Sequence, residues 1–299
     1  MAEQSIKSGP GPPGVGSGPA GVGSGPPGVG SVPAAEARER VRVEISDHVA
    51  VVTLTRPDKH NALDPAMFQG IIEAAGRLVT EPGLRAIVLH GDGPSFCSGL
   101  DVMSIMAAGG GVDGLLEPLR GEVPNWFQRT AYDWLHVPVP VIAALHGNCL
   151  GGGLQVALAA DIRIAAPDTR LSVMEVKWGL IPDMAITRTL PRLVGIDVAK
   201  ELTYTGKVIS GTEANELGVV TRLADDPFTA ARELAAEIAS KSPDAVRGAK
   251  RLFDSSWTGS AEETLALEAE LQLGLIGSPN QLAAVAAGMA KQTPEFVDP

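Results

Sequence analysis

The sequence lacks several features that would assign it to a common protein class. Only two of its 299 residues are cysteine, Cys97 and Cys149, which are too few for a disulfide framework and fit a reducing compartment. No run approaches the ~20 apolar residues of a membrane-spanning helix, and the N-terminus has no apolar core of a signal peptide. We therefore expect a cytoplasmic protein that does not associate with a membrane.

Positive charge is also scarce. Lys and Arg number 24 against 35 Asp and Glu, a formal net charge of −11. Nucleic acid is therefore not an expected partner, because neutralising phosphates requires a basic face. The sequence contains no His/Cys cluster with metal-ligand spacing, no P-loop lysine and no Gly-x-Ser-x-Gly elbow. We expect neither a metal nor a redox cofactor.

Glycine and proline are concentrated at one end of the chain. A seven-residue unit occurs as Ser17-Gly-Pro-Ala-Gly-Val-Gly23 and then as Ser24-Gly-Pro-Pro-Gly-Val-Gly30, and residues 8–35 carry no charge. Collagen needs glycine at every third position, which a period of seven excludes. Too few apolar side chains are present to offset the entropy of ordering, so residues 1–37 are predicted to form a disordered leader.

The rest of the chain alternates between strand and helix patterns. Val41, Val43 and Ile45 alternate with polar residues, as in a half-buried strand, and His48–Thr55 continues as the second strand of a hairpin. Further predicted elements are a helix over 67–79, a strand over 85–91, a helix near 125–135, a strand over 139–145 and a helix over 152–160. This order predicts an α/β layer fold with parallel strands and right-handed crossovers. Strands become scarce beyond about 185, where amphipathic helices are predicted near 228–238 and 262–276.

Three segments carry residues suited to chemistry: Ser95–Val102, His146–Val156 and Ser172–Asp183. The first two follow strands, and glycines at such turns let backbone N–H groups approach a ligand closely. Two turns of this kind could aim two N–H donors at one developing oxyanion. Taken singly, the Gly151–Gly153 cluster also fits a tight strand–helix corner, and Glu175 and Asp183 also fit solvated surface carboxylates. The two cysteines fit buried packing residues.

Together, the motifs resemble those of the crotonase (enoyl-CoA hydratase/isomerase) superfamily from about Arg42 onward. The motifs that carry the resemblance are Leu54-Thr-Arg-Pro-Asp-Lys-His-Asn-Ala-Leu63, Phe96-Cys-Ser-Gly-Leu-Asp101, Gly147-Asn-Cys-Leu-Gly-Gly-Gly153, Ala160-Asp-Ile-Arg163 and Gly179-Leu-Ile-Pro182. The resemblance implies a spiral of ββα turns over 38–240 and a helical trimerisation region over 241–299. It also implies an acyl-CoA thioester substrate, with no cofactor beyond that CoA, and a homotrimer or a dimer of trimers.

The resemblance further implies a catalytic site. The backbone N–H groups of Leu100 and Gly152 would form the oxyanion hole for the thioester carbonyl. Hydratases of this family carry two glutamates, and this chain has Gln155 and Glu175 at those positions. An amide can orient a water but cannot abstract its proton, so hydration by two carboxylates is not expected.

A second reaction type of the family fits the remaining carboxylates better. Dienoyl-CoA isomerases have an additional aspartate eight residues after the glutamate, and Asp183 stands at that distance from Glu175. Asp183 is assigned to proton removal and Glu175 to reprotonation, by resemblance; chemistry alone allows the reverse. Double-bond isomerisation of an enoyl- or dienoyl-CoA is therefore predicted. Hydration, other acyl-CoA chemistry such as thioester hydrolysis, and non-catalytic acyl-CoA binding remain as alternatives.

Binding residues are assigned last. An acidic protein needs local cations for the CoA phosphates, and the candidates are Arg56, Lys59, Lys250 and Arg251, which also fit a solvated charged face. Candidates for the wall of the acyl pocket are Leu100, Met103, Met106, Trp126 and Trp178. Ordinary core packing explains these apolar residues equally well.

Overall fold

The computed structural model describes residues 33–107, 116 and 123–298. A six-stranded sheet forms its centre, in the order β1-β2-β3-β4-β6-β9. These strands are β1 (Val41–Ser46), β2 (Val49–Leu54), β3 (Ala86–Gly91), β4 (Val141–Leu145), β6 (Ile162–Ala165) and β9 (Arg222–Leu223). All neighbours pair in parallel except the β1–β2 hairpin, so the predicted hairpin and the predicted parallel sheet are both confirmed.

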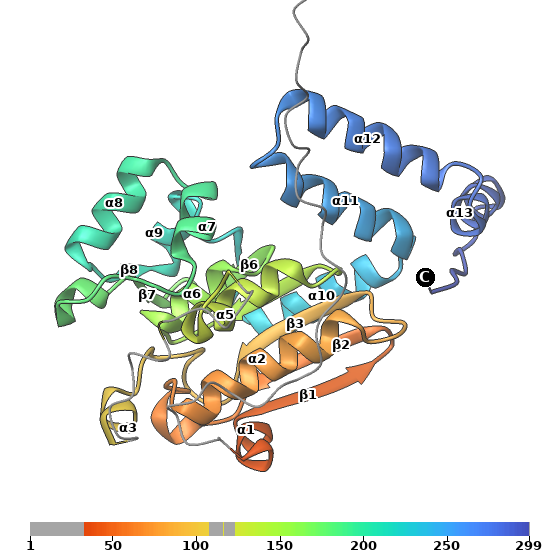
Figure 1. Cartoon of the computed structure of the whole chain (residues 1–299). Coiled ribbons are helices and arrows are strands. Elements are labelled where there is room, and N and C mark those ends of the chain that lie inside the picture. Colours follow the sequence, from red (N-terminus) through yellow and green to blue (C-terminus); the bar gives the residue numbers. More distant parts are fainter. Residues whose placement is uncertain (1–32, 108–115, 117–122, 299) are drawn as a thin grey trace, which may run out of the picture.

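Helices cover both faces of this sheet. On one face α2 (Pro65–Val79), α5 (Trp126–Tyr132) and α6 (Gly152–Leu158) contribute to the main core cluster. On the other face lies α10 (Pro227–Ala239) (Figure 1). Its Ala231 and Ala235 share a core cluster with Val88 and Ile142. Strands covered on both faces read as continuous apolar runs, which is why β3 and β4 show no alternation.

The second half of the chain is mainly helical, as predicted. After the short helices α3 (Val102–Ala107) and α7 (Ile186–Thr189) come α8 (Ile196–Thr205), α9 (Gly211–Glu216), α11 (Pro243–Ser256), α12 (Ala261–Leu275) and α13 (Pro279–Ala290). A second sheet of three short strands contains β5 (Asn148–Leu150), β7 (Arg170–Ser172) and β8 (Ile209–Ser210). In the part of the chain that the structure describes, no helix has the length and apolar character to cross a bilayer.

Helices α12 and α13 project away from the sheet (Figure 1). None of the residues of α12 is buried, and its leucines lie on more than one side of the helix. Leu265 and Leu273 of α12 are 61% and 74% exposed, although leucine is usually buried. The surface of α12 is therefore suited to contact with further protein.

The predicted end of the leader at residue 37 differs from the structure. Ala34–Arg40 form helix α1, and Ala37 within it is fully buried. The Ala-, Glu- and Arg-rich sequence favours a helix, with Glu36 in the first turn and Arg40 in the last complementing the helix dipole. Gly70 of α2 makes the close approach possible, since a Cβ there would lie 2.6 Å from the carbonyl oxygen of Ala37. Residues 1–32 of the predicted leader lie outside the described residues.

Candidate active site

The loop between β2 and α2 is held by one buried asparagine. The Asn61 side chain accepts from the backbone N–H of Arg56 and donates to the carbonyl oxygens of Asp92 and Ser95. His60 and Asn61 both have left-handed backbone conformations, with φ of 50° and 55°. Such conformations persist where the surroundings over-determine them. The loop is thus a rigid element beside the segment Ser95–Leu100.

Leu63, at the end of this loop, pairs with Leu100 in a parallel bridge. The Leu63 N–H donates to the carbonyl oxygen of Gly99 (2.8 Å), and Asp101 N–H donates to the carbonyl oxygen of Leu63 (3.0 Å). Peptide groups of an extended chain alternate in direction, so the N–H of Leu100 points away from Leu63. Among the described residues, the Leu100 N–H has no hydrogen-bond acceptor.

The Gly151 turn lies on the side of Leu100 opposite Leu63. A Cβ at Gly99 would lie 2.8 Å from the carbonyl oxygen of Leu150, so only glycine permits this approach. Gly151 has φ 52° and ψ −125°, a conformation that is essentially restricted to glycine. Gly152 then begins α6, where its N–H has no acceptor within the helix. The two N–H groups predicted for the oxyanion hole therefore come from adjacent segments.

Gln155, on the next turn of α6, is 1% exposed and uses both ends of its amide. Its Nε2 donates to Glu175 Oε1 over 2.6 Å, and its Oε1 accepts from the backbone N–H of Met184 over 2.8 Å. The amide therefore connects Glu175 to the residue that follows Asp183. Two of the four hydrogen bonds that this amide can make are therefore taken by protein groups.

Glu175 begins a short 3₁₀ segment, Glu175–Trp178, and lies against Gly151, whose Cβ would be 3.5 Å from Glu175 Oε1. Its Oε2 is buried and has no hydrogen-bond partner among the described residues. Burial raises the pKa of Glu175, and the nearby charge of Asp183 adds to this increase. Hydrogen bonds, including the one from Gln155, oppose it. A carboxyl group with a raised pKa and one free oxygen is suited to exchanging a proton with a ligand.

Asp183 is half-buried, and burial raises its pKa as well. The adjacent Met184 is buried, and a Cβ on Gly152 would lie 3.0 Å from its Sδ. Ala185 has a φ of 61°, a left-handed conformation that is uncommon for a residue with a Cβ. The structure thus brings together the predicted residues Gly152, Gln155, Glu175 and Asp183.

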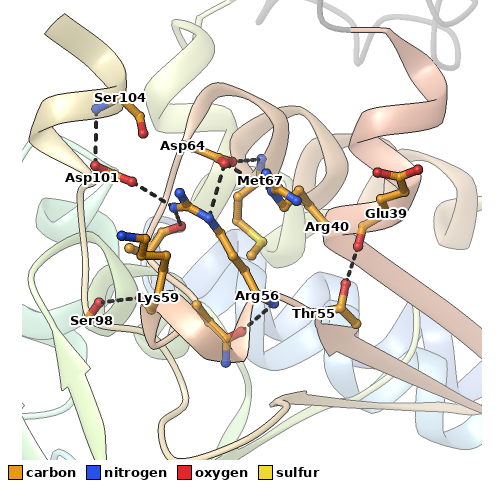
Figure 2. A network of polar contacts seen from close by, with 12 residues as sticks. Glu39, Arg40, Thr55, Arg56, Lys59, Asp64, Met67, Ser98, Asp101 and Ser104 are labelled. Carbon is orange, nitrogen blue, oxygen red and sulfur yellow. Dashed lines mark hydrogen bonds and ion pairs between the residues drawn. The ribbon is translucent and has the colours of Figure 1, made fainter. Parts of the chain in front are cut away.

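The four predicted cationic residues are placed differently from one another. The Arg56 side chain is 12% exposed and lies between the carboxylates of Asp64 and Asp101 (Figure 2). Lys250 Nζ bonds Asp161 Oδ1 over 2.6 Å, and Arg251 bonds Glu270. Lys59 is exposed, on the same loop as Arg56.

Lys250 also borders a cavity of about 490 Å³ between α6, α10 and α11. Arg163, Arg192 and Trp257 are among its lining residues, whereas Gln155, Glu175 and Asp183 are not. Within this chain, Lys250 is therefore not brought to the carboxylate pair.

The residues predicted for the acyl-pocket wall differ in burial. Trp126 is buried, and its ring centroid lies 5.0 Å from that of Phe68 (tilted) and 5.2 Å from that of Phe127 (edge-on). Its Nε1 donates to Gln69 Oε1, so it is a core residue, the alternative that the sequence left open. Met103 and Trp178 are 76% and 68% exposed. The side chain of Met106 lies outside the described residues.

Both cysteines are buried, as predicted, and both are free thiols. Their backbones pair in an isolated parallel β-bridge. Burial raises the pKa of Cys97 to about 12 and raises that of Cys149 strongly, so neither is a reactive thiolate near neutral pH. Among the described residues no group of three His, Cys, Asp or Glu side chains could hold a metal ion.

Sequence reasoning missed the contribution of Asp101 and Met184. Asp101 belongs to the Phe96–Asp101 motif, and its carboxylate pairs with Arg56 and caps α3. Met184 contributes a backbone N–H that orients Gln155. A backbone contact of this kind leaves no signal in the residue type.

Comparisons with known proteins agree with this geometry. The family model described as enoyl-CoA hydratase/isomerase matches residues 44–298. The chain is 33% identical to a mitochondrial Δ(3,5)-Δ(2,4)-dienoyl-CoA isomerase of Rattus norvegicus, over 87% of this chain and 86% of the relative. It is 36% identical to an (E)-benzylidenesuccinyl-CoA hydratase of Thauera aromatica, over 71% of this chain and 80% of the relative.

A crystal structure of an enoyl-CoA hydratase from Bacillus anthracis superimposes with a TM-score of 0.76 at 31% identity. The match covers 86% of this chain and 98% of that structure. The similarity therefore includes both the sheet that carries the glycine turns and the helices that follow it.

Proposed function

Because this chain belongs to the enoyl-CoA hydratase/isomerase family, with the crotonase fold, we propose that it isomerises a double bond of an enoyl- or dienoyl-CoA. The observation that carries the proposal is the Gln155 amide at the position of a second hydratase glutamate, bonded at both ends to protein groups. Two carboxyl groups with raised pKa values, Glu175 and Asp183, remain for proton transfer.

In the proposed reaction Asp183 removes a proton from C2 of a 3-enoyl or 3,5-dienoyl thioester. The C2–H electron pair moves into the conjugated system, and the thioester oxygen gains negative charge, which the N–H groups of Leu100 and Gly152 stabilise. Glu175, protonated at Oε2, then donates its proton to C4 or C6, and the double bonds shift toward the carbonyl. One proton is lost and one is gained by the substrate, so no external acid, base or oxidant is consumed.

Hydration of a 2-enoyl-CoA is the second candidate, with Glu175 as its single carboxylate. The 36% identity to the Thauera aromatica hydratase favours it. Against it, water activation needs a base at the attacking water and an acid at the α-carbon, and Gln155 can serve as neither.

Lys59 is an exposed cation of the rigid loop between β2 and α2, and we propose that it contacts the CoA phosphates. No cofactor beyond the CoA of the substrate is needed, so treatment with EDTA should leave the rate unchanged.

A homotrimer or a dimer of trimers is proposed for the assembly, supported by the unburied apolar surface of α12. In such an assembly, Lys250 and Arg251 would reach a site across subunits. A cytoplasmic location stays a prediction.

Incubating the purified protein separately with 3-enoyl-, 3,5-dienoyl- and 2-enoyl-CoA tests the proposal. We expect conversion of the 3-enoyl or 3,5-dienoyl substrate to its conjugated isomer. Rapid formation of 3-hydroxyacyl-CoA from the 2-enoyl substrate, undiminished by Asp183→Asn, would establish hydration instead.

A further inference from the structure

Arg56 makes contacts unlike those of a phosphate-binding arginine. Its Nη1 donates to Asp101 Oδ2 over 2.9 Å and to the carbonyl oxygen of Ala62 over 3.1 Å, and its Nε lies 3.4 Å from Asp64 Oδ2 (Figure 2). The planar guanidinium thus engages three acceptors from its own chain. A phosphate would have to compete with two carboxylates for this mostly buried group.

The acceptors of Arg56 flank one particular feature, the bridge between Leu63 and Leu100. Ala62 immediately precedes Leu63, and Asp101 immediately follows Leu100. Asp64, the residue after Leu63, also accepts from Arg40 and caps α2 through the N–H of Met67. Arg56 therefore ties both strands of the bridge to the start of a fifteen-residue helix.

Asp101 is held on its other side too. Its Oδ1 accepts from the N–H of Ser104 in the first turn of α3. Burial opposes its ionisation, but hydrogen bonds from Ser104 and Arg56 outweigh burial and lower the pKa of Asp101. The carboxylate is thus charged at neutral pH and fixed at both oxygens.

We propose that Arg56, through its ion pair with Asp101, is a positioning residue that fixes the direction of the Leu100 N–H in the oxyanion hole, and that it is not a ligand of the CoA phosphates. The assignment rests on the acyl-CoA chemistry proposed above. The Asp101 carboxylate and the Leu100 N–H belong to adjacent residues, so a shift of this carboxylate would also displace the N–H. A donor displaced by about 1 Å can lower the rate about 10²-fold.

A chromophoric thioester separates positioning from binding. In 4-dimethylaminocinnamoyl-CoA the amino group is conjugated with the thioester carbonyl, and hydrogen bonds that polarise this carbonyl move the absorption band to longer wavelength. Titration of wild type, Arg56→Lys, Asp101→Asn, Lys59→Ala and Arg42→Lys then yields a Kd and a band shift for each protein. Arg42 pairs with Glu44 and Asp92 on the surface and is the matched control for an arginine-to-lysine change.

We expect Arg56→Lys to bind the probe with a Kd close to that of wild type, but with a smaller band shift and a kcat for acyl-CoA turnover about 10²-fold lower. Asp101→Asn, which is isosteric and leaves Arg56 in place, should show the same pattern. Lys59→Ala should raise Kd while keeping the full band shift, and Arg42→Lys should match wild type. The double variant Arg56→Lys/Asp101→Asn should lose no more than the worse single variant, because one ion pair accounts for both effects.

A full band shift with a raised Kd in Arg56→Lys would overturn the proposal and make Arg56 a CoA ligand. Tighter probe binding by Asp101→Asn would do the same, since removing the carboxylate would free Arg56 for phosphate. If wild type binds the probe and shifts its band but catalyses hydration, the proposed isomerisation fails while the role of Arg56 stands. If wild type does not bind the probe, both fail.

Discussion

Gln155 Nε2 donates to Glu175 Oε1 over 2.6 Å, and this contact divides the carboxyl group of Glu175 into two unlike oxygens. Oε1 is held by the amide, while Oε2 is buried and unpartnered among the described residues. The same amide accepts from Met184 N–H, next to Asp183. A single neutral side chain thus fixes the spacing between two acidic groups, a task that a second carboxylate could perform only at the expense of charge repulsion.

The first prediction concerns Gln155→Glu. The new carboxylate would lie about 2.6 Å from Glu175 Oε1, so the pair must share a proton, as adjacent carboxyl groups do. It would also restore a second acid–base group, and such groups typically contribute 10²–10⁴-fold to a rate. We expect hydration of 2-enoyl-CoA to rise at least about tenfold relative to isomerisation, measured as the ratio of 3-hydroxyacyl-CoA to isomer formed. Gln155→Leu is the control, and equal product ratios in the two variants would contradict the prediction.

The second prediction is a dependence of stability on pH. Burial raises the pKa of Asp183, so between its unfolded and folded pKa values the folded chain binds more protons than the unfolded chain. The free energy of unfolding therefore falls as pH rises through this interval. We expect Asp183→Asn to be more stable than wild type at pH 7, with the difference shrinking toward pH 4, as measured by urea unfolding. A difference that stays constant over this range would rule out this account of Asp183.

The third prediction concerns catalysis by Glu175. Glu175→Gln keeps the shape but removes the transferable proton, so we expect turnover to fall about 10²–10⁴-fold with an unchanged circular dichroism spectrum. Glu201→Gln, an exposed partner of Lys207, is the surface control and should retain wild-type turnover. Full activity in Glu175→Gln would remove Glu175 from the mechanism.

The fourth prediction compares two helical glycines. A Cβ on Gly153 would lie 2.6 Å from the carbonyl oxygen and 2.8 Å from the Sγ of Cys97, both fully buried, so Gly153→Ala should destabilise the protein by about 1–3 kcal/mol. At Gly76, in the last turn of α2, such a Cβ would point into open space. Gly76→Ala should therefore stabilise the protein by about 0.5–1 kcal/mol. Denaturant midpoints measure both changes, and changes of the same sign would be inconsistent with this packing.

The fifth prediction concerns the C-terminal segment. Asn280 is buried, donates to Asp244 Oδ2 and to the carbonyl oxygen of Val297, and accepts from Val297 N–H. Asn280→Ala leaves buried groups unpaired, which should cost about 1–3 kcal/mol and accelerate hydrogen exchange at Val297. Gln292→Ala, at an exposed position, is the control and should change neither quantity.

The hairpin, β3, β4, α2 and α6 could be predicted from sequence because each has a local signal, whereas the short strands β5 and β7 were not predicted. Val41, Val43 and Ile45 alternate as a strand does, and the hairpin they predict is present. The leader was predicted to extend to residue 37, whereas α1 begins at Ala34 and approaches Gly70, which lies more than 30 residues away. The sequence likewise left open whether the Trp126 ring would pack against Phe68 and Phe127 or line a pocket.

The sequence by itself determined the residue types available for chemistry: glycines at two strand ends, an amide at Gln155, and the carboxyl groups Glu175 and Asp183. Only the tertiary structure decided what each type does. It buried Glu175 and Asp183 enough to raise the pKa of both, and it turned Arg56 toward Asp101, 45 residues away. The physical reason is that periodicity and turn chemistry act over a few residues, whereas burial and ion pairing depend on which distant segments the fold places side by side.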